Sequence, residues 1–255
     1  MHNRVVHARF YAPGAEKTGD AVILPDEEAQ HLRRVLRLAA GTTVRVFNGR
    51  GQEFDARVAT AGSRGVQVMV GLPRVPAARE PGVAVTLAQA VLKGDKMDDL
   101  VRDAVMIGVA AVQPIVTART EITLASLRRG KRPERWRRIA ISSAKQCGRA
   151  TVPSILEPRP FEALPVALAE MTLPGPGLMF VEPSVSTDAM ALSELAGPPP
   201  RETTVIIGPE GGWSVDELAR ASAACRFITL GSRTLRADAM PLVALAVMFA
   251  VWKEL

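Results

Sequence analysis

The hydrophobic pattern of the chain changes about a third of the way along it. In the first third, three short runs alternate between apolar and polar residues, as half-buried strands do. These runs are Thr43–Phe47, Glu53–Val58 and Val66–Val70. The stretch Asn48–Gly51 between the first two has the composition of a hairpin turn. One short helix is expected at Glu27–Leu38, so residues 1–72 are predicted to form a small β-barrel that carries one helix.

A linker is predicted at residues 73–82, where Pro73, Pro76 and Pro81 interrupt any apolar periodicity. Beyond it, continuous apolar runs alternate with helical patterns. The runs resemble buried parallel strands and are Val83–Leu87, Val112–Val116, Leu178–Val181, Val205–Ile207 and Phe227–Leu230. The helical patterns are Lys96–Ile107, Pro133–Lys145, Phe161–Met171 and Ser214–Ala224. This order indicates an α/β fold with a doubly wound parallel sheet, whose ligand sites lie beyond the carboxyl ends of the strands.

The last helix is expected at about Ala239–Leu255 and carries an apolar stripe. The stripe consists of Leu242, Leu245, Ala246, Phe249 and Trp252. It could pack on the core of the same domain or against a second subunit.

Composition narrows the class of protein. The 255 residues are 47% hydrophobic and 23% charged, as in ordinary globular proteins. The net charge of +6 and the pI near 9.9 favour a polyanionic partner such as nucleic acid. The two cysteines, Cys147 and Cys225, form no disulfide framework, and the longest apolar stretch is too short to cross a bilayer. A cytoplasmic location is therefore predicted.

Several chemistries are excluded by missing motifs. The three histidines lie within the first 31 residues, so the α/β part has no histidine-based zinc site, and no metal is predicted. The α/β part also has no GxGxxG after a strand, no P-loop and no GxSxG elbow.

Two glycine-bearing loops follow predicted strands. Gly208-Pro209-Glu210-Gly211-Gly212 leads into a helix that Ser214 and Glu217 can cap. The second loop, Leu230–Pro241, carries Arg233 and Arg236. A plain turn and solvated arginines would explain each loop alone, but two such loops at strand ends favour a shared pocket. Glu182, at a third strand end, could accept hydrogen bonds from ribose hydroxyls or simply be exposed.

Two basic segments are candidate phosphate-binding surfaces. The first is Arg128–Arg138 together with Gln146–Arg149, and the second consists of Arg33, Arg34 and Arg37 at helical spacing. A solvated helix face is the alternative for both.

At these residues the chain resembles the bacterial 16S ribosomal RNA uridine N3-methyltransferases, a branch of the SPOUT superfamily. Seven motifs occur in the family's order along nearly the whole chain. They are Arg9–Tyr11, His31–Arg37, Phe47–Gly51, Lys93–Asp98, Gln146–Arg149, Gly208–Gly212 and Leu230–Arg236. The chain differs from residues that the family usually has at Asp103, Met106, Ser142, Lys145, Asp238 and Ala239.

The resemblance implies an N-terminal PUA-like β-barrel (residues 1–72), a SPOUT methyltransferase domain with a trefoil knot (residues 83–255) and a homodimer. It also implies S-adenosyl-L-methionine as cofactor and 16S ribosomal RNA or the assembled small subunit as partner. The expected cofactor-binding residues are Glu182, Gly208, Pro209, Glu210, Gly211, Gly212, Leu230, Gly231, Leu235 and Arg236. The candidate catalytic residues are Arg236, Arg9 and Asp238. The candidate RNA-binding residues are Arg9, Arg33, Arg34, Arg37, Lys93, Arg135, Arg138 and Arg149.

Two other functions stay open at this stage. One is a noncatalytic RNA-binding protein with a degenerate enzyme domain. The other is a methyltransferase that acts on a different base or on ribose. Binding of S-adenosylmethionine distinguishes the first, and mass spectrometry of ribosomal RNA distinguishes the second.

Overall fold

The computed structural model describes residues 8–62, 65–170, 173, 175–185 and 188–255. His2 and His7 lie outside the described residues, as does Met171, the last residue of one predicted helix. The chain divides into two compact units, which are described separately. Unit 1 comprises residues 1–80 and 144–152, and unit 2 comprises residues 81–143 and 153–255. Among the described residues, no helix is both long and apolar enough to cross a membrane.

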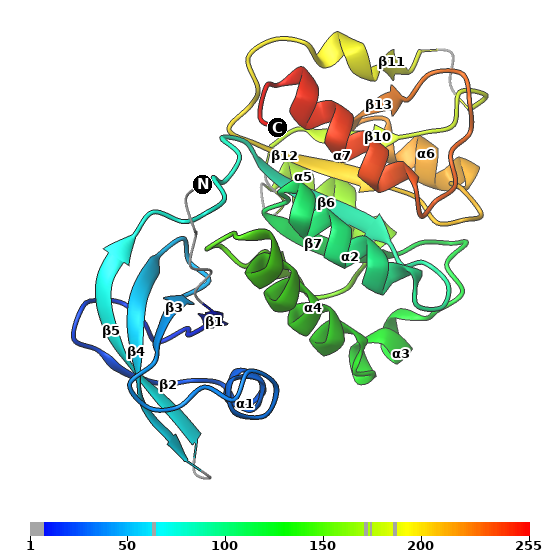
Figure 1. Cartoon of the computed structure of the whole chain (residues 1–255). Coiled ribbons are helices and arrows are strands. Elements are labelled where there is room, and N and C mark those ends of the chain that lie inside the picture. Colours follow the sequence, from blue (N-terminus) through cyan, green and yellow to red (C-terminus); the bar gives the residue numbers. More distant parts are fainter. Residues whose placement is uncertain (1–7, 63–64, 171–172, 174, 186–187) are drawn as a thin grey trace. The chain divides into compact units, whose positions relative to one another are not determined.

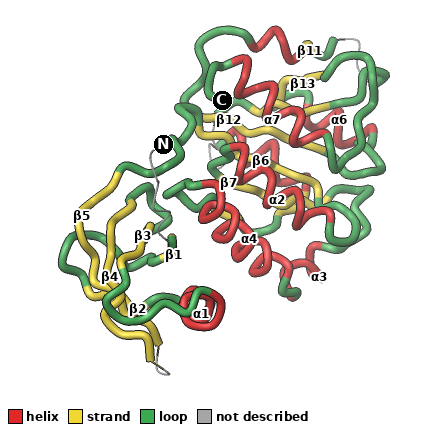
Figure 2. Tube along the Cα trace, viewed as in Figure 1, coloured by secondary structure: helices red, strands yellow, loops and turns green. Residues whose placement is uncertain are grey.

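Unit 1 is built on a five-stranded sheet with the order β1-β3-β4-β5-β2 (Figures 1 and 2). Its strands are β1 (Arg9–Tyr11), β2 (Ala21–Ile23), β3 (Thr43–Phe47), β4 (Glu53–Gly62) and β5 (Gly65–Arg74). The predicted hairpin is confirmed, because β3 and β4 pair antiparallel around a turn in which Gly49 has a φ of +78°. β5 continues through Pro73 and Arg74, where the sequence predicted a linker. The alternating inward residues of these strands, among them Val44, Val46 and Val68, form the core of the unit.

The predicted helix at Glu27–Leu38 is only partly correct. α1 (Asp26–Gln30) passes into a π-helical turn, η1 (His31–Val35). Arg37 then has a φ of 52°, the left-handed conformation, which cannot continue a right-handed helix. Arg33, Arg34 and Arg37 therefore do not share one regular helical face, as their spacing had suggested.

Unit 2 contains a parallel sheet of eight strands in the order β11-β13-β10-β12-β6-β7-β8, with β9 also paired to β7. The strands are β6 (Ala84–Ala90), β7 (Ala111–Val116), β8 (Ser154–Ile155), β9 (Arg159–Pro160), β10 (Gly177–Phe180), β11 (Met190–Ala191), β12 (Glu202–Ile207) and β13 (Cys225–Thr229). The helices are α2 (Lys96–Ile107), α3 (Leu124–Arg129), α4 (Arg132–Cys147), α5 (Leu164–Ala169), α6 (Val215–Ala221) and α7 (Met240–Val251), with the 3-10 turns η2 (Phe161–Ala163) and η3 (Leu192–Leu195). The last turn of α4 belongs to unit 1. Every apolar run that predicted a buried strand is confirmed within a few residues, because parallel strands covered on both faces are apolar throughout.

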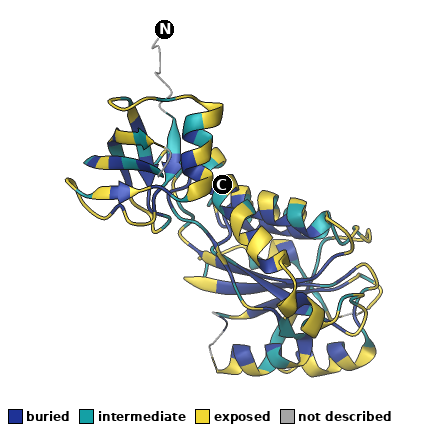
Figure 3. Ribbon diagram, turned by 90° about the horizontal axis from the view of Figure 1, so that it is seen from below, coloured by how far each residue is buried: buried dark blue, intermediate teal, exposed yellow. Residues whose placement is uncertain are grey.

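Alternation along the strands assigns the two faces of this sheet. Ala88, Met179 and Ile206 pack in one cluster with α5 and the start of η2. Their neighbours, such as Leu87 and Val205, point to the opposite face, which α2 and α7 cover (Figures 1 and 2). The strands are accordingly the most deeply buried part of the unit, and the outer helix faces are exposed (Figure 3).

The last helix buries a stripe that is rotated from the predicted one. Leu245, Phe249 and Trp252 are buried as expected, but Ala244 and Met248 complete the buried face. Leu242 and Ala246 are only partly covered. The helix packs on the core of unit 2, and a further apolar row, Val243, Val247 and Ala250, is exposed on the described surface.

Candidate active site

A pocket of about 420 Å³ opens beyond the carboxyl ends of β10, β12 and β13. It is lined by the loop after β12, by the segment before α7, and by Glu182 after β10. β10 lies between β12 and β13 in the sheet, so the loops that follow these strands leave from one edge. The tertiary structure therefore brings together the two glycine-bearing loops that the sequence placed about 20 residues apart.

Eight of the ten expected cofactor-binding residues line this pocket. They are Glu182, Gly208, Pro209, Glu210, Gly211, Gly212, Leu235 and Arg236. Leu230 and Gly231 are not among its lining residues, and the lining of this second loop begins at Thr234, after a turn at Gly231 and Ser232. Asp238 also lines the pocket.

Lys96, at the start of α2, connects the two loops electrostatically. Its Nζ lies 3.2 Å from Oε1 of Glu210 and 3.9 Å from Oδ2 of Asp238. The Glu210 carboxylate also accepts a hydrogen bond of 3.2 Å from the backbone N–H of Lys93. Lys96 was part of a recognised motif, but no pattern in the sequence indicated that it reaches both loops.

Both carboxylates have lowered pKa values. Burial alone raises the pKa of Glu210, but hydrogen bonds from its own backbone N–H and that of Lys93, together with Lys96, outweigh it. Desolvation likewise raises the pKa of Asp238. The hydrogen bond and the charge interaction with Arg236 lower this pKa, Lys96 adds a smaller contribution, and together they outweigh desolvation. Both groups are therefore anionic at neutral pH, and the pocket contains fixed negative as well as positive charge.

The loop after β12 is held by two residues that the sequence analysis did not single out. Nη1 of Arg119 donates a 2.7 Å hydrogen bond to the carbonyl of Gly211. Nε1 of Trp213 donates to the carbonyl of Phe180 at 2.9 Å, and its ring packs on that of Phe161. A tryptophan directly after two glycines is the local signal that could have suggested that this side chain packs beneath the loop.

The predicted capping of α6 is confirmed. The hydroxyl of Ser214 accepts from the backbone N–H of Glu217, whose carboxylate accepts from the backbone N–H of Ser214. The other oxygen of the buried Glu217 carboxylate accepts from the backbone N–H of Ala118 at 2.8 Å. The cap thus also fixes the loop after β7, which carries Arg119.

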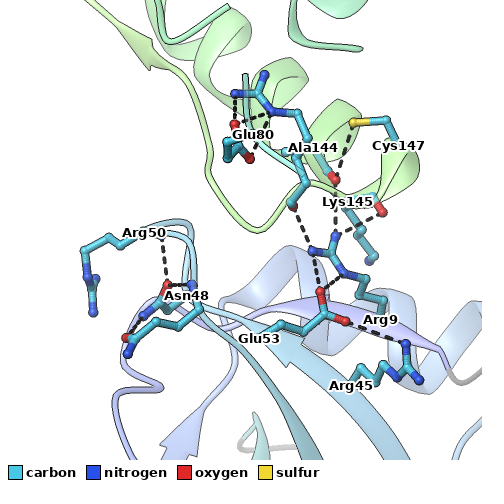
Figure 4. Close-up of polar contacts among 11 residues, drawn as sticks. Arg9, Arg45, Asn48, Arg50, Glu53, Glu80, Ala144, Lys145 and Cys147 are labelled. Atoms are coloured by element: carbon cyan, nitrogen blue, oxygen red, sulfur yellow. Dashed lines mark hydrogen bonds and ion pairs between the residues drawn. The ribbon is translucent and has the colours of Figure 1, made fainter. Parts of the chain in front are cut away.

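Arg9 has a structural role within unit 1 (Figure 4). Its guanidinium pairs with the buried carboxylate of Glu53 at 2.9 Å and donates to the backbone carbonyls of Ala144, Lys145 and Arg149. All three guanidinium nitrogens are engaged in these contacts, and the group also stacks 3.9 Å from the centre of the Phe47 ring. The donors of Arg9 thus hold residues 144–149, and its role toward substrate stays a prediction.

Arg149, a predicted RNA-binding residue, is likewise engaged within unit 1. Its side chain is 4% exposed and forms a two-point ion pair with Glu80, with a shortest distance of 2.6 Å. A buried and paired guanidinium cannot reach a phosphate without breaking that pair.

The remaining basic candidates are at least partly accessible. Arg34 and Arg37 are exposed, and the partly buried Arg33 donates to the carbonyl of Gly62. Lys93 pairs with Glu121 at 2.6 Å. Arg135 contacts Asp95 and Asp98, and Arg138 contacts Glu134. The predicted basic face of α4 is therefore substantially neutralised by carboxylates.

Two family models match the chain. The RNA methyltransferase domain matches residues 79–249, and the RNA methyltransferase PUA domain matches residues 24–70. Ribosomal RNA small subunit methyltransferase E of Synechocystis is 30% identical over 239 residues, which cover 88% of this chain and 71% of that protein. The same-named protein of Bacillus subtilis is 26% identical and covers 86% of each chain.

Two solved structures extend the likeness to the fold. The methyltransferase E of Neisseria gonorrhoeae, bound to S-adenosyl methionine, is 31% identical with a TM-score of 0.83, covering 96% of this chain and 98% of that one. A methyltransferase of Legionella pneumophila, in complex with the cofactor SAM, is 29% identical with a TM-score of 0.84 and the same coverage.

The fold and the pocket define an α/β enzyme domain with a parallel sheet, joined to an N-terminal PUA domain. This is the architecture of an RNA-modifying methyltransferase. The chain belongs to the ribosomal RNA small subunit methyltransferase E family of RNA methyltransferases.

Proposed function

We propose that the chain transfers a methyl group from S-adenosyl-L-methionine to N3 of one uridine in 16S ribosomal RNA. The observation that carries this proposal is that Gly208–Gly212 and the segment before α7 line one and the same pocket. The structures of similar proteins of about 30% identity, from Legionella pneumophila and Neisseria gonorrhoeae, contain bound S-adenosylmethionine. The target base and atom follow from the family resemblance.

The pocket suits a cofactor of this size and chemistry. Its volume of about 420 Å³ falls within the roughly 300–1,000 Å³ of small-molecule sites. A Cβ on Gly211 would lie 3.1 Å from Cβ of Arg119, so a side chain there would crowd the wall of the pocket. Glycines in this loop let backbone groups approach a ligand closely. We propose that backbone groups of Gly208–Gly212 hold the adenosyl part and that Glu182 accepts hydrogen bonds from ribose hydroxyls.

S-adenosylmethionine, when bound, supplies an electrophilic methyl group on a positively charged sulfur. The protein must then align the uracil N3 and favour the anion that remains when N3 loses its proton. We propose Arg236 for this role, because its side chain lines the pocket and is 77% exposed, so its charge can face a substrate. Its Nε and Nη2 each lie 3.2 Å from Asp238. The lowered pKa of Asp238 makes it a weak proton acceptor, so we propose that Asp238 orients Arg236.

The two parts of the chain divide this work. We propose that residues 1–72 form a PUA-like RNA-binding domain, that residues 73–82 are a linker, and that residues 83–255 form the methyltransferase domain. Among the four candidate arginines of the first domain, Arg34 and Arg37 are exposed and can meet phosphates.

We propose a homodimer and a trefoil knot on the strength of the family resemblance. The exposed apolar row Val243, Val247 and Ala250 on α7 supports the dimer, because it adds apolar area on the outer side of a helix whose other side is already packed. The meeting of the loop after β12 with the segment before α7 is compatible with the knot. Sedimentation of the wild type and of Val247→Asp tests the dimer, and a monomeric wild type contradicts it.

The decisive experiment compares ribosomal RNA from a deletion strain and from the same strain that carries the gene again. Mass spectrometry should show loss of 3-methyluridine from 16S ribosomal RNA and its return. Calorimetric titration should show one S-adenosylmethionine per chain. Loss of a different modified nucleoside would refute the uridine target. Absence of cofactor binding would refute the proposal that the chain is a methyltransferase.

A further inference from the structure

We propose that a second pocket on the same edge of the sheet binds a phosphate of the RNA strand beside the target nucleotide. This inference rests on the proposed function and adds a named site for its substrate. The pocket measures about 410 Å³ and lies beyond β6 and β7. It is lined by Lys93, Glu121, Thr123, Ser126 and Arg132, with a short apolar wall.

The second pocket adjoins the cofactor pocket through one hydrogen bond. The backbone N–H of Lys93 donates to Oε1 of Glu210, and Glu210 lines the cofactor pocket. The side chain of Lys93 lines the second pocket. A nucleotide that presents its base at the first pocket therefore has its backbone within reach of the second.

The charges in the second pocket favour an anion. Lys93 and Arg132 contribute two positive charges, and Glu121 is the carboxylate among its described lining residues. Nζ of Lys93 lies 2.6 Å from Oε1 of Glu121, and the two side chains are 53% and 66% exposed. Exposed ion pairs of this kind are weak and exchange readily. A phosphate, which offers more acceptor oxygens and more charge than one carboxylate, can take the place of Glu121 beside Lys93.

Arg132 differs from its neighbours on α4. Arg135 contacts Asp95 and Asp98, Arg137 contacts Glu157, and Arg138 contacts Glu134. Among the hydrogen bonds and ion pairs of the described residues, Arg132 has no carboxylate partner, and its side chain is exposed. An arginine left unpaired in a row of paired ones has its full charge available for a ligand.

Two hydroxyl-bearing residues, Thr123 and Ser126, also line this pocket. Oγ1 of Thr123 accepts the backbone N–H of Ser126, which leaves its own hydrogen free to donate. Ser126 carries a second hydroxyl that can donate. Two cations and two hydroxyls around one cavity form a donor set suited to phosphate oxygens.

The test measures binding of a 16S ribosomal RNA fragment that contains the target uridine, by fluorescence anisotropy over a series of salt concentrations. Arg132→Gln should weaken binding several-fold and lower the salt slope by about one. Arg137→Gln is the matched control, since it removes the same charge from the same helix but leaves the pocket intact, and it should weaken binding less. Glu121→Gln should tighten binding about twofold to fivefold, because Lys93 loses its competitor.

Each other outcome overturns the inference. Equal losses for Arg132→Gln and Arg137→Gln would show a general charge effect, and unchanged or weaker binding for Glu121→Gln would refute the exchange. A wild type that does not bind this RNA would also refute it. Calorimetric titration with S-adenosylmethionine should be the same for all four proteins. If the wild type did not bind S-adenosylmethionine, the proposed methyltransferase function would be refuted. The RNA-binding measurements alone decide whether the second pocket binds a phosphate.

Discussion

Gly212 is the residue of the Gly208–Gly212 loop whose backbone conformation requires glycine. Its φ is +68°, a left-handed conformation that costs an L-residue about 1–2 kcal/mol. A Cβ there would lie 3.5 Å from Oε1 of Glu182, which is an ordinary contact. Gly212→Ala therefore introduces backbone strain without a steric clash.

The strain must appear in one of two measurements. If the loop keeps its shape, the free energy of unfolding falls by about 1–2 kcal/mol, and the melting temperature falls by about 2–4 °C for each kcal/mol. If the loop relaxes instead, the same free energy is lost on binding, and S-adenosylmethionine binds about 5- to 30-fold more weakly. Thermal denaturation and calorimetric titration together should account for the full cost.

Two variants separate the causes. Gly212→Asn should recover part of the loss, because asparagine tolerates the left-handed conformation better than alanine. Gly14→Ala is the control, since its Cβ would lie 3.4 Å from Cγ1 of Val22 and its φ is not left-handed. If Gly212→Ala changes neither melting temperature nor affinity, the reasoning from backbone conformation is wrong. If Gly212→Asn is as impaired as Gly212→Ala, strain is not the cause.

Three further predictions follow from burial and charge. Burial raises the pKa of Cys225 to about 11, so its thiol should resist iodoacetamide at pH 8 in the folded protein and react after denaturation; peptide mapping that finds Cys225 rapidly labelled in the native protein would contradict this. The pKa of Glu210 is below its ordinary value of 4.5, so its ionised form stabilises the fold above that pH and the benefit is lost as the pH falls through the folded pKa. The melting temperature of Glu210→Gln should therefore lie below that of the wild type at pH 7, and the difference should shrink below about pH 4.5; a difference that grows in acid would reverse the sign. Arg149→Met should lower the free energy of unfolding by about 2 kcal/mol, less than the roughly 3–5 kcal/mol of a fully buried pair, because Glu80 is 34% exposed and can reach water; denaturant unfolding measures this, and an unchanged midpoint would contradict the structural role.

The secondary structure of unit 2 could be predicted well because strands that are buried on both faces are continuous apolar runs in the sequence. Val205–Ile207 and Val112–Val116 are apolar throughout, as strands covered by helices must be, and both lie within the observed β12 and β7. Ser214 and Glu217 predicted the start of α6 because capping acts over three residues. The helix at Glu27–Leu38 was predicted to be too long, because the left-handed residue that follows it is Arg37 and not the glycine that usually marks such a position.

The candidate site was predictable as two loops, but its connections were not. Glycine-rich turns after strands could be read directly, and most of the expected cofactor residues line one pocket. Arg119 and Lys96 enter the same pocket from elements that lie far from it in sequence. The ion pairs of Arg9 with Glu53 and of Arg149 with Glu80 could not be predicted either, because a sequence pattern cannot distinguish an exposed arginine from a paired one.

The sequence by itself determined where strands, helices and glycine turns occur, because these depend on periodicity and on preferences that act within a few residues. It also determined the family, through motifs kept in order along the chain. Only the tertiary structure decided which arginine is bound to a buried carboxylate, which strand ends adjoin, and which charged groups share a pocket. These depend on strand order in the sheet, which places residues far apart in the chain within hydrogen-bonding distance.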